Sequence, residues 1–252
     1  MSGTNHYWDF KPEVFVSKDH GQIELFVRGE GPALILLHEL PGLADKTFEL
    51  GDYFVKAGFK VILPLLFGRA GDDNALLGFA KVCIRKELRD LWQGKDTKIV
   101  HLIQELASRE SQVAKNSGVG VVGMCLTGNM VLALLLNNQD IRSPITAPVM
   151  AQPSSSYSAP ALAAAKSGDI ARAVLALRFD KDWICSRTSF NKLEEAFETC
   201  TAANGQSLMV RELEGKQHST LTYHYKPLSV DVRTKETIDA RKEVVSFLKE
   251  QI

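Results

Sequence analysis

The sequence predicts an α/β protein with a mostly parallel central sheet, helices on both faces and an N-terminal β-hairpin. Three observations carry this prediction. Short apolar runs without polar alternation recur along the chain, as expected for strands that are covered on both faces. Segments with helical spacing separate these runs. Strand and helix alternate through most of the 252 residues, and such alternation is typical of a parallel sheet with helical crossovers.

Each element can be justified in chain order. The two segments that flank His20-Gly21 have strand-like composition and predict a hairpin. The helix that follows the first apolar strand ends on Gly58, a helix stop signal. The N-terminal part contains the hairpin strands (13–19 and 22–29), a strand in PALILLHEL, a helix over 46–58, a strand in KVILPLL, and two helices within 79–116 that separate near Gly94.

The C-terminal part continues the same alternation. It contains a strand in VGVVGM, a helix in LTGNMVLALLLNN, a strand in ITAPVM, a short helix within 159–173, a strand in AVLALRF, a helix over 189–203, a strand in SLMVREL and a helix over 232–252. No repeat or convincing linker interrupts the chain, so we expect residues 1–252 to form a single domain. The segment 152–160, QPSSSYSAP, is expected to be a loop near the functional site.

Composition excludes several classes of function. Lys plus Arg number 30 and Asp plus Glu number 30, so no net charge favours nucleic acid or an anionic membrane. No apolar run approaches the roughly 20 residues that span a bilayer, and the N-terminus lacks the features of a signal peptide. The spacing of the four cysteines fits no metal or redox motif, and reduced thiols are expected. A cytoplasmic protein that acts on a small molecule is therefore predicted.

The segment GVGVVGMCLTGNMVLALLL places a cysteine at a sharp corner between a strand and a helix. Gly123 and the glycine at 128 flank Cys125 in a Gly-Met-Cys-Leu-Thr-Gly sequence, and glycines there allow close backbone approach. The pattern resembles the nucleophile elbow G-x-S-x-G, with cysteine in place of serine and the second glycine one residue later. The N-terminus of the following helix favours an anion, so a thiolate forms more easily there. Cys125 is the candidate nucleophile, against the alternative of a buried thiol in a glycine-rich turn.

A cysteine nucleophile needs a base and an acid that orients the base. In a strand–elbow–helix architecture the acid and then the histidine follow the nucleophile in the chain. His218 lies in the loop after SLMVREL and is the candidate base, with His224 as the alternative. The acid is expected just after AVLALRF, where Asp180 and Asp182 both occur and either could instead cap a helix.

At this point the chain resembles the dienelactone hydrolase family (carboxymethylenebutenolidase-like enzymes), which has the α/β-hydrolase fold. The resemblance covers nearly the whole chain and rests on LILLHELPGL, LPLLFGRAG, GVVGMCLTG, LRFDKDWIC and EGKQHSTLT, in that order. It implies Cys125 as nucleophile, His218 as base and Asp182 as acid, because FDKD parallels the family's G-x-x-D segment. It also implies that Glu39, in HELPG, controls ionisation of the resting thiol; the alternative is a surface or loop-anchoring carboxylate.

The remaining site residues concern the oxyanion and the substrate. Backbone N–H groups of Leu126, which follows the nucleophile, and Leu40, in the loop after LILLHE, are expected to form the oxyanion hole. The resemblance places Arg69 where the family has one of two arginines that hold a substrate carboxylate, and a guanidinium suits a carboxylate. The second arginine position holds Thr222, which departs from the family pattern. A solvated loop arginine is the alternative for Arg69.

We therefore predict a hydrolase that cleaves an ester or lactone of a small molecule, with or without a carboxylate on it, through a Cys-His-Asp triad and a thioester acyl-enzyme. No metal or organic cofactor is implied. Two alternatives stay open: a thioesterase or acyltransferase that uses the same site, and an α/β-hydrolase-fold protein that binds a partner without turnover.

Overall fold

The computed structural model describes residues 9–39, 42–71, 90, 97–115, 117–137, 143–153, 157, 162–163, 172–198, 208–222 and 232–252. It begins with the predicted hairpin, β1 (Lys11–Ser17) and β2 (Gly21–Arg28), which pair antiparallel with Phe15 opposite Ile23. Both of these side chains are buried, whereas the other face of β1 exposes Val14 and Val16. The hairpin therefore has one face toward the core and one toward solvent, as alternation requires.

The strands form one 8-stranded sheet in the order β1-β2-β4-β3-β5-β6-β7-β8. Only the hairpin is antiparallel to its neighbours; the pairs from β4 to β8 are all parallel. The further strands are β3 (Ala33–Leu37), β4 (Lys60–Pro64), β5 (Val119–Met124), β6 (Ile145–Ala151), β7 (Val174–Phe179) and β8 (Leu208–Leu213). Every residue of β3, β5 and β7 is buried, which explains why their sequences are apolar apart from Arg178 in β7.

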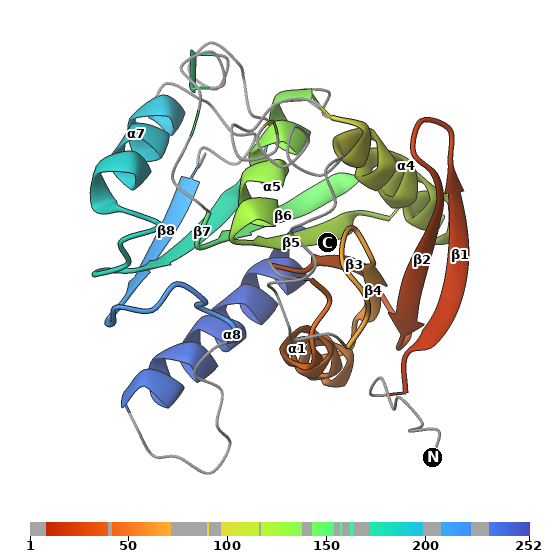
Figure 1. Cartoon of the computed structure of the whole chain (residues 1–252), viewed down its shortest axis with the longest axis horizontal. Coiled ribbons are helices and arrows are strands. Elements are labelled where there is room, and N and C mark those ends of the chain that lie inside the picture. Colours follow the sequence, from red (N-terminus) through yellow and green to blue (C-terminus); the bar gives the residue numbers. More distant parts are fainter. Residues whose placement is uncertain are drawn as a thin grey trace.

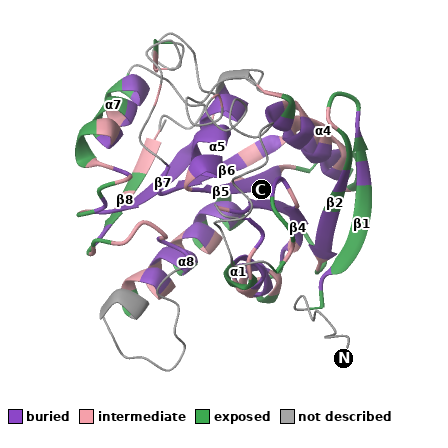
Figure 2. Ribbon diagram, in the orientation of Figure 1, coloured by how far each residue is buried: buried purple, intermediate pink, exposed green. Residues whose placement is uncertain are grey.

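Helices cover both faces of the sheet (Figure 1). On one face lie α1 (Asp45–Lys56) and α8 (Val232–Gln251), and on the other lie α4 (Lys98–Val113), α5 (Leu126–Asn137) and α7 (Arg187–Phe197). Two apolar clusters fill the spaces between the layers, one under each set of helices, and the buried residues of sheet and helices face one another (Figure 2). Burial of each such Leu or Phe side chain contributes about 1.5–3 kcal/mol to folding.

Helix ends follow the capping chemistry in the sequence. The Thr97 hydroxyl accepts a hydrogen bond from Val100 N at the start of α4, and the Ser186 hydroxyl accepts one from Ser189 N at the start of α7. After α1, Gly58 has φ +100, a conformation that favours glycine, and the chain turns there into β4.

The predicted fold class is confirmed, and the described strands and helices agree with the predicted alternation. Of the first helix predicted within 79–116, only Asp90 is described, and it is helical, while the second helix is α4. Of the short helix predicted within 159–173, only Leu162 and Ala163 fall within it as helical described residues. In the part of the chain that the structure describes, no helix combines the length and apolarity needed to cross a membrane.

Candidate active site

The corner between β5 and α5 has the strained geometry expected of a nucleophile elbow. Cys125 adopts φ +55, which L-residues rarely do, and its N–H donates to Ala151 O at 3.0 Å. A Cβ at position 123 would collide with the carbonyl oxygen of Thr127, so only glycine fits there. The Cys125 side chain is partly exposed. The strained turn therefore presents the sulfur at the carboxyl edge of the parallel strands.

Thr127 supports this turn in a way that the sequence analysis missed. Its buried hydroxyl accepts from Met124 N at 2.9 Å and lies 3.2 Å from Leu37 O, an acceptor on the neighbouring strand β3. The hydroxyl thereby ties the elbow to the adjacent strand. The sequence signal for this role was that Thr127 lies inside the G-x-C-x-x-G segment. A buried hydroxyl next to a strained turn needs hydrogen-bond partners.

His218 and Asp182 come together at the same edge of the sheet. The Nδ1–H of His218 donates to Asp182 Oδ2 at 2.8 Å, and the Asp182 side chain is fully buried. The other ring nitrogen, Nε2, is also buried, and among the described residues no polar group meets it with hydrogen-bond geometry. The Cys125 thiol interacts with this ring. The three groups thus stand in the order thiol, imidazole, carboxylate.

The charge state of His218 reflects these neighbours. Burial lowers the pKa of His218, but the hydrogen bond to Asp182 and the interaction with the Cys125 sulfur outweigh burial and raise the pKa from 6.5 to about 10. At neutral pH such a pKa favours the imidazolium form of His218, held by the buried carboxylate of Asp182. By contrast, burial raises the pKa of the Cys185 thiol to about 12, so that thiol stays protonated.

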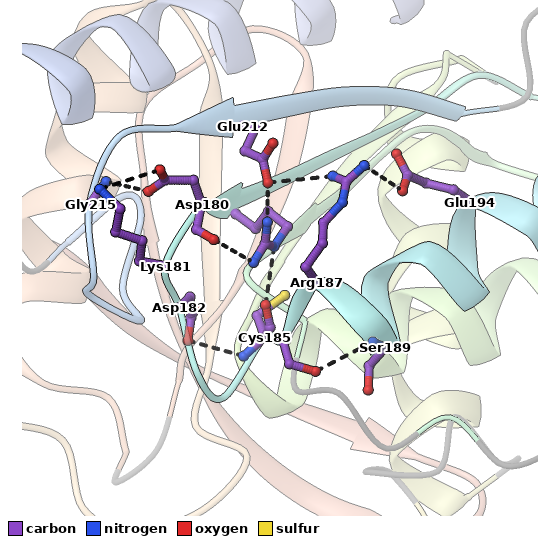
Figure 3. Close-up of polar contacts among 11 residues, drawn as sticks. Asp180, Lys181, Asp182, Cys185, Arg187, Ser189, Glu194, Glu212 and Gly215 are labelled. Carbon is purple, nitrogen blue, oxygen red and sulfur yellow. Dashed lines mark hydrogen bonds and ion pairs between the residues drawn. The ribbon is translucent and has the colours of Figure 1, made fainter.

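The two candidate acids have different partners. Asp182 Oδ1 accepts from Ile184 N at 2.8 Å and from Cys185 N at 3.0 Å, which leaves Oδ2 for His218. Asp180 Oδ1 instead accepts from Gly215 N at 2.8 Å and so links the ends of β7 and β8. Figure 3 shows the Asp180 side chain directed to Gly215 and Asp182 directed to the backbone at Cys185. The geometry therefore separates the two aspartates, which the sequence left as alternatives.

Glu39 is held by the loop that carries His218. Its Oε2 accepts from the Ser219 hydroxyl at 2.7 Å and from Gln152 Nε2 at 3.4 Å, and its Oε1 accepts from the Thr222 hydroxyl at 2.5 Å. Thr222 thus occupies the second arginine position of the family pattern and binds Glu39. These bonds match the loop-anchoring alternative for Glu39, and they place a carboxylate beside the triad.

Gln152 is a second residue that the sequence analysis did not single out. It is fully buried with φ +36, and its Oε1 accepts from the N–H of Thr220 at 3.0 Å and from the Thr220 hydroxyl. The backbone N–H of Gln152 donates to Leu177 O at 2.7 Å. Gln152 therefore connects the end of β6, next to the elbow, directly to Thr220 in the histidine loop. Its side-chain amide also contacts Glu39. Its place in the segment 152–160, expected near the site, was the only signal.

His38, directly after β3, is fully buried and has a structural role. Leu66 N donates to its Nε2 at 3.1 Å, so the ring proton resides on Nδ1, which lies 3.2 Å from Glu39 O. Burial lowers the pKa of His38 to about 4, although the backbone contact at Glu39 opposes that shift. The ring stays neutral and links the ends of β3 and β4.

The remaining predicted residues divide as follows. Leu126 is the first residue of α5, where N–H groups lack partners within the helix, so its N–H needs an acceptor from elsewhere. Arg69 is exposed in the segment after β4. Leu40, the alternative base His224, and the cysteines Cys83 and Cys200 lie outside the described residues. Within the described ranges, no group of three or more His, Cys, Asp and Glu side chains could hold a metal ion.

Solved structures resemble this chain over almost its full length. A protein of Klebsiella pneumoniae assigned to the dienelactone hydrolases is 14% identical, with a TM-score of 0.66 over 94% of this chain and 98% of that one. The dienelactone hydrolase-like promiscuous phosphotriesterase P91 from metagenomic libraries is 15% identical, with a TM-score of 0.65 and the same coverage of 94% and 98%. The Pyrococcus furiosus esterase Pf2001 is 14% identical, with a TM-score of 0.60 over 96% of this chain and 93% of that one.

At these identities the likeness establishes the α/β-hydrolase fold. No curated protein matches the chain in sequence. The sequence profile of the dienelactone hydrolase family, however, matches residues 26–252, which include every candidate residue named above. The chain belongs to the dienelactone hydrolase family, and its enzymatic class is that of the carboxylic ester hydrolases.

Proposed function

We propose that residues 1–252 form one domain that hydrolyses an ester or lactone of a small molecule through Cys125, His218 and Asp182. One observation carries the proposal. His218 is bound to Asp182 at 2.8 Å through Nδ1, the Cys125 thiol interacts with the ring, and no other polar group of the part of the chain that the structure describes binds the buried Nε2. A buried ring nitrogen that no other polar group satisfies lowers stability, and a titratable group with a strongly shifted pKa beside a thiol is typical of a functional site.

The proposed reaction follows from this geometry. The Cys125 sulfur attacks the substrate carbonyl carbon, and the N–H groups of Leu126 and Leu40 stabilise the oxyanion. His218 Nε2 donates its proton to the leaving oxygen as the C–O bond breaks, which leaves a thioester on Cys125. Water then attacks the thioester, His218 accepts its proton, and the C–S bond breaks to release the acid and regenerate the thiolate–imidazolium pair. Asp182 holds the ring through both steps.

Glu39 is proposed to modulate the resting thiol. Its hydrogen bonds to Ser219 and Thr222 keep a carboxylate next to the histidine loop. A like charge nearby disfavours thiolate formation, and movement of this carboxylate on substrate binding would remove that penalty. Its bonds to the loop also help to hold His218 in place.

The substrate proposal concerns charge. Arg69 is exposed after β4, the strand beside β3, so it is available to a substrate carboxylate at the carboxyl edge of the sheet. With Thr222 engaged by Glu39, Arg69 is the residue that we propose for this contact. The partner is a small ester or lactone, without nucleic acid or membrane. The cytoplasm is proposed as the location, because a cysteine nucleophile must stay reduced.

The test is capture of the acyl-enzyme. The enzyme is mixed with p-nitrophenyl butyrate, quenched in acid and measured by intact mass and peptide mapping. We expect one butyryl group on Cys125 and a burst of nitrophenolate, and we expect Cys125→Ala to show neither. Acylation of another residue, or full turnover by Cys125→Ala, would refute the proposed nucleophile. Addition of alcohol or thiol acceptors separates hydrolysis from acyl transfer, since a transferase would yield mainly the new ester or thioester.

A further inference from the structure

The loop that carries Asp182 rests on a buried arginine. Arg178, in β7, is 1% exposed and is among the largest fully buried side chains of the described residues. Its guanidinium packs 5.7 Å from the centroid of the Phe190 ring in α7. A buried guanidinium loses a large solvation energy, and an apolar side chain would fill the same space without that cost. The donors of Arg178 should therefore show what it is needed for.

Two of the guanidinium nitrogens donate hydrogen bonds to the loop that carries Asp182, residues 180–186, which we call the acid loop. Arg178 Nε donates to Cys185 O at 3.1 Å, and Nη2 donates to Asp180 O at 3.2 Å. The third donor, Nη1, binds the carboxylate of Glu212, which lies opposite Arg178 in the register of β7 and β8. The planar guanidinium thus holds one carbonyl on each side of Asp182 at fixed directions.

The peptide group at Cys185 connects the arginine to the acid. Its carbonyl accepts from Arg178, and its N–H donates to Asp182 Oδ1 at 3.0 Å. Asp182 in turn presents Oδ2 to His218 at 2.8 Å. A displacement of the loop carbonyls would therefore move the carboxylate relative to the imidazole, and misplacement by about 1 Å can cost about 10²-fold in rate.

We propose that Arg178 is a positioning residue for the reaction, which clamps the acid loop by its carbonyls and so holds Asp182 in line with His218. This inference rests on the proposed function, because it requires that Asp182 orients the base. Glu212 balances the buried charge from the half-exposed edge strand β8, where it also lies 3.4 Å from Arg187 Nη1. Glu212 does not touch the acid loop through any bond that the structure shows among its described residues, so it serves as a control.

The test is a double-mutant cycle measured on the full-length enzyme with a p-nitrophenyl ester. Arg178→Lys keeps the charge but lacks the fork that reaches both carbonyls, so we expect kcat to fall about 10- to 100-fold with KM changed less than about threefold. In the Asp182→Asn background, the same Arg178→Lys change should have almost no further effect, because its influence passes through Asp182. Glu212→Gln, which keeps a hydrogen-bond acceptor for Arg178, should lower kcat less than about threefold.

Three outcomes overturn the proposal: that Arg178→Lys lowers kcat as much in the Asp182→Asn background as in the wild type, that Glu212→Gln lowers kcat as much as Arg178→Lys does, or that Arg178→Lys leaves kcat unchanged. Should Arg178→Lys not fold by thermal melting, Arg178→Gln, which retains an amide donor, takes its place in the cycle. The NMR resonance of the His218 Nδ1 proton gives an independent readout, and it should shift in the Arg178 variant but not in Glu212→Gln. Full activity of Asp182→Asn alone would instead refute the proposed triad.

Discussion

Replacement of Asp182 by asparagine should switch the tautomer of His218. Two N–H groups, of Ile184 and Cys185, donate to Asp182 Oδ1 at 2.8 and 3.0 Å. An asparagine must keep its carbonyl oxygen at that position, because an NH2 group there would face two donors. Its NH2 group must then face Nδ1 of His218, which becomes an acceptor. The ring proton is forced onto Nε2, where the thiol proton would have to go.

The magnitude follows from this wrong tautomer. The same substitution lowers kcat by roughly 10⁴ in a serine triad, or about 5.5 kcal/mol. A thiol is more acidic than a hydroxyl and depends less on its base, so we expect a loss of about 10²- to 10⁴-fold for Asp182→Asn. The lost charge-assisted hydrogen bond to His218 should cost about 1.5–3 kcal/mol of stability, which lowers Tm by about 3–12 °C. The variant should remain folded at 25 °C.

The assay is kcat/KM on a p-nitrophenyl ester, with thermal melting and ¹⁵N chemical shifts of His218 to report folding and tautomer. Asp180→Asn is the matched control, because its amide oxygen can still accept from Gly215 N, and among the contacts of the described residues the variant otherwise loses only the charge of the exposed 3.8 Å ion pair with Lys181. Its activity should stay within about threefold of wild type.

Two results would refute the reasoning. A larger loss in Asp180→Asn than in Asp182→Asn would move the orienting acid to Asp180. An unchanged His218 tautomer in Asp182→Asn, together with activity within tenfold of wild type, would show that the 2.8 Å contact does not orient the ring.

Three further predictions concern charge. The pKa of His218 is raised to about 10, so protonated His218 stabilises the fold fully below pH 6.5, and this stabilisation is lost as pH rises through about 10. The pKa of His218 measured by NMR should fall in Cys125→Ala. An unchanged value would mean that the resting thiol is not ionised. Arg69→Ala should remove a roughly ten- to hundredfold preference in kcat/KM for an ester with a free carboxylate over its amide-capped partner, and equal loss on both would mean that Arg69 does not bind substrate. Glu39→Gln should speed alkylation of Cys125 by iodoacetamide at neutral pH, because a like charge is removed, and unchanged labelling would assign Glu39 to loop anchoring alone.

The sequence by itself determined the fold class and the strained strand-to-helix corner at Cys125. Both depend on local patterns: unbroken apolar runs predict strands covered on both faces, and glycines around Cys125 predict a strained strand-to-helix corner. The structure has these features because burial and backbone strain act over a few residues. His218 also follows from a local rule, since polar residues after parallel strands gather at the carboxyl edge of the sheet.

Only the tertiary structure decided which groups meet at that edge. Asp180 and Asp182 are two residues apart, and aside from the family resemblance, which favoured Asp182, either could have been the acid. The turn after β7 directs Asp180 to Gly215 and Asp182 to His218. Glu39 and Ser219 are 180 residues apart, and their contact depends on the order of strands in the sheet, which no local pattern encodes. Arg178 appears in sequence as one polar residue within a strand, and its role exists only through the loop carbonyls that fold over it, because side-chain partners are chosen by proximity in space rather than along the chain.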